Sequence, residues 1–69
     1  MKLTSQEIQD NSEYFNFLFQ LRASGRTNMF DAAPWLVDAF MLEKSEARKI
    51  LADWMNNFDE IAKELKVDV

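Results

Sequence analysis

Residues 47–65 read ARKILADWMNNFDEIAKEL, and this stretch decides the fold of the chain. Its apolar residues recur at intervals of four, three, four, three and four positions, as Ala47, Leu51, Trp54, Phe58, Ile61 and Leu65. That spacing is the period of an α-helix with one apolar face. Ile50, Met55 and Ala62 widen this face to an arc of roughly 140°. The pattern predicts one long helix over about residues 45–65, packed on one side.

A second helix is expected over about residues 5–24. Thr4 and Glu7 have the spacing of a capping box, which marks a helix N-terminus. Gly25, the only glycine in the chain, stands where a left-handed C-terminal residue is favoured. The polar residues at 11–12 offer an alternative start, and we favour one helix whose first turns fray.

The remaining expected helix covers about residues 31–41. Asp31 is placed to cap it, and Pro34 falls in the first turn, where a backbone N–H has no partner. Only Asp38 interrupts its apolar surface, which is typical of a helix at the centre of a domain or covered by a partner. Together these patterns predict an all-α protein, a compact three-helix domain spanning residues 1–69. The second and third helices are expected to have a helix-turn-helix-like arrangement.

Composition limits the classes of function. The chain has 69 residues, enough for one domain, and 48% of them are hydrophobic, which favours a dense core. Cysteine and histidine are both absent, which removes the usual ligands of zinc, iron and copper and the common activated nucleophiles. We therefore expect no enzyme activity, no catalytic residues, and neither a cofactor nor a metal.

Charge and hydropathy indicate a location and a class of partner. The formal net charge of −4 argues against unspecific attraction to nucleic acid or to anionic lipid. Every apolar run, including residues 35–37, is far too short to span a bilayer, and the first ten residues have no signal-peptide pattern. We expect no membrane association and a cytoplasmic location.

The expected helix at residues 5–24 carries more apolar surface than two other helices easily cover. Its ordinary stripe consists of Tyr14, Phe17, Leu18 and Leu21. Phe15 and Phe19 broaden the stripe to roughly 200°, and Ile8 lies on the same flank. One interpretation is that these side chains lean over the edge of the core. The interpretation that we favour is an exposed protein-binding surface for another protein or for a second copy of the chain.

DNA binding is the alternative function. Residues 37–51, VDAFMLEKSEARKIL, have the rhythm of a helix-turn-helix motif. Lys44, Arg48 and Lys49 would then face phosphates or base edges from the recognition helix. Acidic residues on the same turns, the acidic composition of the whole chain and a turn without glycine count against this alternative.

The two tryptophans, Trp35 and Trp54, also have two interpretations. Tryptophan is the residue most enriched in the hot spots of protein interfaces, so either could anchor a partner. Two tryptophans in a small helical domain are more often part of the core. We therefore expect both to be buried.

Two segments of the chain carry a resemblance to a known group of proteins. They are LRASGRTNMFDAAPWL (21–36) and SEARKILADWM (45–55). They resemble short uncharacterised bacteriophage proteins with the consensus LRxSGxTNMFGAxPYL, then FGL, then EARxxLxxWM. Asp31 and Met41 stand where the consensus has glycine. The resemblance implies a phage-type origin, a location in the host-cell cytoplasm and a host protein as a candidate partner, and it supplies no activity.

Overall fold

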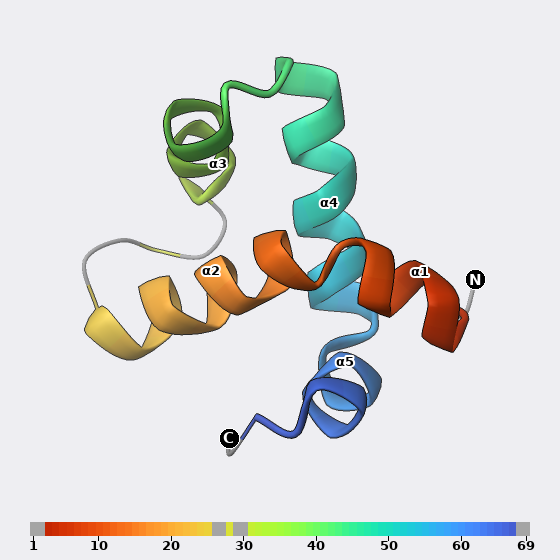
Figure 1. Cartoon of the computed structure of the whole chain (residues 1–69). Coiled ribbons are helices and arrows are strands. Elements are labelled where there is room, and N and C mark those ends of the chain that lie inside the picture. The colour runs from red at the N-terminus through yellow and green to blue at the C-terminus, as the bar shows by residue number, and fades with distance from the viewer. Residues whose placement is uncertain (1–2, 26–27, 29–30, 68–69) are drawn as a thin grey trace.

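The computed structural model describes residues 3–25, 28 and 31–67 and is all-helical over this part of the chain (Figure 1). Its helices are α1 (Ser5–Asp10), α2 (Ser12–Ser24), α3 (Ala33–Phe40), α4 (Lys44–Asn56) and α5 (Phe58–Leu65). The predicted all-α class is confirmed. The predicted number of three helices is wrong, because the first and the last expected helix are each divided in two. Residues 26–27 and 29–30 of the connection between α2 and α3 lie outside the described residues.

An asparagine divides each of the two expected long helices. Asn11 has φ −106° and ψ 15°, and Asn57 has φ −125° and ψ 26°, so both leave the helical conformation. Each side-chain amide donates to the carbonyl oxygen four residues earlier, Asn11 to Glu7 at 3.0 Å and Asn57 to Asp53 at 2.9 Å. Each asparagine carbonyl then accepts a hydrogen bond from the first turn of the next helix. The apolar spacing continues through both breaks, which is why periodicity predicted unbroken helices.

The outer ends of α1 and α2 follow the predicted signals. Thr4 Oγ1 accepts from the backbone N–H of Glu7, and Glu7 Oε1 accepts from the backbone N–H of Thr4, so the capping box is formed. Gly25 ends α2 in the left-handed conformation, with φ 67°, and its N–H donates to the carbonyl of Arg22 at 3.2 Å.

Helix α3 begins and ends with less help from side chains. Pro34 lies in its first turn, as predicted, but the predicted cap at Asp31 is wrong, since Ala32 precedes the helix and no side chain caps it. After Phe40 the chain turns at Met41, which has a left-handed backbone with φ 55° and ψ 42°. Three residues in all separate α3 from α4.

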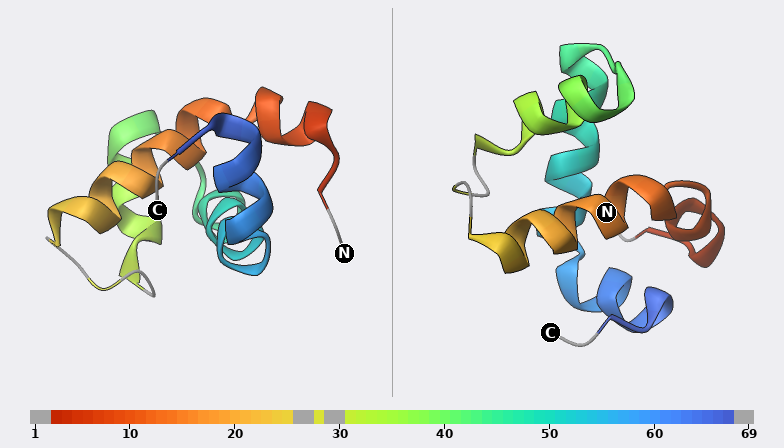
Figure 2. Two further views of the ribbon diagram at one scale, coloured as in Figure 1. Left: turned by 90° about the horizontal axis from the view of Figure 1, so that it is seen from below. Right: turned by 60° about the vertical axis from the view of Figure 1, so that its left-hand side comes forward.

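Helix α4 is the central element of the fold. Helix α3 packs along its first half, while α2 and α5 pack against its second half and α1 packs against α2 and α5 (Figure 1). Figure 2 shows α3 and the first half of α4 projecting from the body that the other helices form. The expected central position of the helix at residues 31–41 is therefore wrong, since Leu36 is the one buried residue of α3.

Aromatic side chains fill the core where α2, α4 and α5 meet. The rings of Phe19, Trp54 and Phe58 contact one another with centroid distances of 5.2–5.4 Å. The complete set of buried apolar residues in the described chain is Ile8, Phe15, Leu18, Phe19, Leu21, Ala32, Leu36, Ala47, Ile50, Leu51, Trp54, Ile61 and Ala62. Most of them come from α2, α4 and α5, so the main core lies at the second half of α4.

Two further groups of contacts hold the helices at the edges of the molecule. Phe40, at the end of α3, contacts Tyr14 and Phe17 of α2 edge-on, with centroids 4.9 and 5.4 Å apart. At the other side, the Glu64 carboxylate of α5 accepts hydrogen bonds from Ser5 at 2.8 Å and from Gln9 at 3.2 Å, both on α1. Helix α3 is thus held at its C-terminal end, and α1 is held to α5.

Candidate functional site

The residues predicted to bind a partner protein lie in the core. Ile8, Phe15 and Phe19 are 3%, 1% and 7% exposed, so they present no surface to another molecule. The flank of α2 that carries Phe15 and Phe19 is covered because α1 packs against α2 and because Phe58 of α5 packs against Phe19. The predicted exposed aromatic flank is therefore wrong, and the alternative interpretation of these side chains as core residues is supported.

Exposed apolar surface is found around α3 instead. The exposed large hydrophobic residues of the described chain are Trp35 at 38%, Met55 at 36% and Met41 at 91%. Trp54 is 2% exposed and belongs to the core as expected, whereas the same expectation for Trp35 is wrong. The difference arises because α3 lies at the edge of the fold and has helices on one side only.

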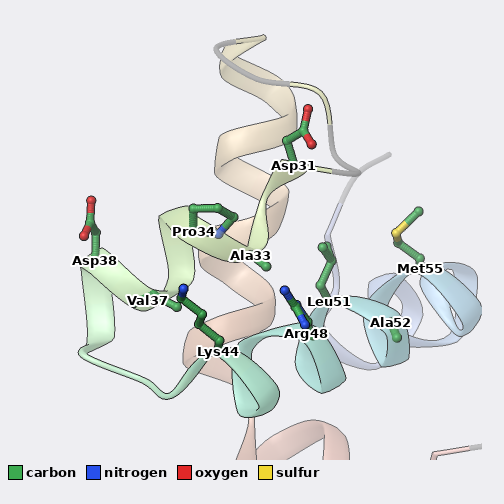
Figure 3. Close-up of a pocket in the computed structure, with 10 residues that line it drawn as sticks. All are labelled: Asp31, Ala33, Pro34, Val37, Asp38, Lys44, Arg48, Leu51, Ala52 and Met55. Atoms are coloured by element: carbon green, nitrogen blue, oxygen red, sulfur yellow. The ribbon is translucent and has the colours of Figure 1, made fainter.

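A groove of about 600 Å³ lies between α3 and α4 (Figure 3). Its apolar lining consists of Ala33, Pro34 and Val37 from α3 and of Leu51, Ala52 and Met55 from α4. On each helix the third of these residues follows the other two by three and four positions, so each helix contributes one face. The volume is within the usual range of pockets that bury the side chains of a ligand.

Charged residues border the same groove. Lys44 and Arg48 lie one turn apart on α4, and in Figure 3 their side chains reach toward α3. Asp31 and Asp38 lie at the α3 side, with their carboxylates directed away from the two cations (Figure 3). The groove therefore has a cationic part at the beginning of α4 and an apolar part further along it.

The structure separates the three cations that sequence reasoning grouped as a DNA-binding set. Lys44 and Arg48 line the groove and form no ion pair with another residue of the described chain. Lys49 does not line the groove, and its Nζ lies 3.4 Å from Oδ2 of Asp53, one turn further along α4. Two of the three predicted residues thus share one site.

Sequence reasoning missed the apolar part of this site. Leu51 and Met55 were both expected on the inward face of a long helix. Leu51 is buried as expected but also lines the groove, whereas Met55 is 36% exposed. The signal that pointed to the site was the nearly continuous apolar surface of residues 31–41, because a helix at the edge of a fold cannot bury every side.

Metal binding, membrane insertion and similarity to known proteins give no further indication of the function. Over residues 3–25, 28 and 31–67, no group of three or more acidic side chains is arranged to hold a metal ion. None of the helices in that part of the chain is long and apolar enough to cross a membrane. Comparison with known proteins finds no matching family model, no similar curated protein and no similar solved structure.

Proposed function

We propose that this protein is a binding module that holds a segment of another protein in the groove between α3 and α4. The observation that supports this function is the apolar lining of an open groove of about 600 Å³. Grooves between helices are a recurrent site for peptide segments, because apolar side chains of the segment can enter between the ridges of the two helices. Met55, one of the lining residues, is exposed, so the apolar lining is accessible to a partner.

The test is to fill the groove and to measure peptide binding. Ala52 is exposed and lines the groove, so Ala52→Phe places a large side chain there without disturbing the core. Ala23→Phe is the matched control, since Ala23 is exposed on α2 and does not line the groove.

A displayed library of random twelve-residue peptides is selected on the wild-type protein, and the affinity of the enriched peptides is then measured by fluorescence anisotropy. We expect Ala52→Phe to weaken binding by about tenfold or more and Ala23→Phe to change it by less than about twofold. Equal binding to all three proteins would place the peptide site elsewhere and overturn the proposal.

DNA binding through α4 is a second candidate function, and the geometry of the turn favours it. An eight-residue helix, a three-residue turn with a left-handed first residue and a following helix are the elements of a helix-turn-helix motif. Met41 adopts the left-handed conformation at that position although it is not glycine. Lys44, Arg48 and Lys49 are exposed on α4.

Duplex DNA of random sequence, labelled with fluorescein, tests this second candidate. A DNA-binding protein should lose affinity when Lys44, Arg48 and Lys49 are all replaced by Ala, and its binding should weaken steeply with salt. Binding that is undetectable at low salt, or equal for the triple variant, would rule out DNA recognition by α4. The acidic composition of the chain makes protein binding the function that we favour.

A further inference from the structure

The distribution of charge along the groove specifies the chemistry of the segment that would occupy it. We infer that the partner segment is acidic and carries a carboxylate close to a large apolar side chain. This inference rests on the proposed protein-binding function and adds to it which class of peptide is selected. It is drawn from the order of residues along α4 and from the directions of the charged side chains.

Lys44 and Arg48 provide the site for the carboxylate. Both side chains reach toward α3 and neither forms an ion pair within the described chain (Figure 3). A guanidinium group can donate two parallel hydrogen bonds to one carboxylate, and a neighbouring ammonium group adds a further attraction. A segment with a carboxylate at this position would therefore pair with two cations that have no acidic partner within the described residues.

Leu51 and Met55 provide the site for the apolar side chain. They follow Arg48 by three and seven residues on the same helix. At a rise of 1.5 Å per residue, the apolar part begins about 5 Å and ends about 10 Å from the guanidinium-bearing residue. A partner in which the carboxylate and the apolar side chain are one helical turn apart matches this spacing.

The acidic residues at the border of the groove leave its cationic part accessible to a carboxylate. Asp31 and Asp38 carry no ion pair within the described chain and face away from the cationic part (Figure 3). An acidic segment bound across Lys44 and Arg48 avoids both of them. The net charge of −4 opposes the approach of an acidic segment in general, so its binding depends on the local attraction of Lys44 and Arg48.

The experiment examines the composition of the peptides that the protein selects and then reverses the charges. We expect the enriched peptides to contain Asp or Glu three or four positions from Leu, Phe, Met or Trp. A synthetic fluorescein-labelled peptide from this set should bind about tenfold more weakly to the Lys44→Glu/Arg48→Glu variant than to the wild type. Its affinity for the wild type should fall by a similar factor when its acidic residues are changed to Gln. Lys49→Glu is the matched control, and it should change the affinity by less than about twofold because Lys49 lies outside the groove.

Exchanging the charges of the peptide and the protein shows whether a loss of binding comes from charge or from misfolding of the variant. The same peptide with Lys in place of its acids should bind the doubly reversed protein better than it binds the wild type, and far-UV circular dichroism should show equal helix content in all variants. Failure of this exchange, or selection of neutral or basic peptides that Ala52→Phe still rejects, would overturn the acidic partner and leave the protein-binding function intact. No enrichment of any peptide would overturn the proposed function itself, and duplex DNA binding lost on the same charge reversal would replace it.

Discussion

The two halves of α4 lie in contrasting surroundings. Its second half carries Trp54, which is 2% exposed and enclosed by aromatic rings from α2 and α5. Its first half carries Lys44 and Arg48 at the cationic part of the open groove, whose apolar part continues along another face of α4 to Met55. A chain of 69 residues has few helices with which to cover a central one, and here they gather at one end. The contrast indicates that the closed end provides stability and leaves the open end available for binding.

The largest effect is expected from polar substitutions in the closed end. Phe15→Ser combined with Phe19→Ser removes two side chains that are 1% and 7% exposed. Each change should cost about 3–5 kcal/mol, and a chain of this length has a total stability of roughly 3–10 kcal/mol. We expect the double variant to be unfolded by far-UV circular dichroism.

The control for this double change lies in the open end. Met41→Ser alters a side chain that is 91% exposed, so it should keep the helical spectrum and a melting temperature close to that of the wild type. A double variant that stays helical would mean that Phe15 and Phe19 are surface residues after all. It would contradict the conclusion that one end of the molecule provides its stability.

The two tryptophans give a smaller and more direct comparison. Trp54→Phe leaves a gap in a packed cluster and should destabilise by about 1–2 kcal/mol. The loss is limited because the buried indole N–H of Trp54 has no hydrogen-bond partner among the described residues. Trp35→Phe, at a site that is 38% exposed, should cost less than about 0.5 kcal/mol.

Acrylamide quenching of the same variants reports the surroundings of each remaining tryptophan. In Trp54→Phe the fluorescence comes from Trp35 and should be quenched readily, whereas in Trp35→Phe it comes from Trp54 and should be protected. Similar quenching constants for the two variants would mean that Trp35 on α3 is no more accessible than Trp54 in the core.

An intermediate effect is expected where α1 joins α5. Glu64→Ala removes the acceptor of two hydrogen bonds from Ser5 and Gln9, and we expect a loss of about 1 kcal/mol in urea unfolding. Glu64→Gln retains one carbonyl acceptor and should lose about half as much. Equal stability of all three proteins would show that the closed end does not depend on this carboxylate.

The smallest effect is expected at the turn that leads into the open end. Met41 is a non-glycine residue at φ 55°, which costs roughly 1 kcal/mol, and its side chain makes little contact because it is 91% exposed. Met41→Gly should therefore stabilise the protein by about 0.5 kcal/mol.

The same substitution in the middle of α3 serves as the control. Ala39 is exposed and helical, so Ala39→Gly should destabilise by about 1 kcal/mol. Opposite signs for the two glycine variants would confirm that the turn carries a conformational cost, and a loss of stability in both would contradict it.

Local signals in the sequence were sufficient for the fold class and for several helix ends. The capping box of Thr4 and Glu7, the left-handed Gly25 and the early position of Pro34 depend on neighbouring residues only, and all were predicted correctly. The break at Asn11 coincides with the alternative helix start at residues 11–12, which we did not favour, and the break at Asn57 was not predicted. The apolar period continues through both, and an asparagine in a helix is compatible with either outcome.

The candidate site was predictable only in part. Lys44 and Arg48 were singled out from their spacing, but for contact with DNA. Which side of residues 31–41 stays uncovered depends on where α2 and α5 pack, and that is decided by contacts between residues distant in sequence. The same limit explains the error at Phe19, whose exposure could not be judged without knowing that Phe58 lies against it.

The hydrogen bond between Ser5 and Glu64 joins positions 59 residues apart, and this has a consequence during synthesis on the ribosome. Helix α1 has six residues, too few to be stable alone in water, so it must wait for residues 58–65 to be translated before it can pack. The contacts between α3 and α4 are close in sequence and need no such delay. We therefore expect the chain to form the contacts between α3 and α4 before it joins α1 to α5.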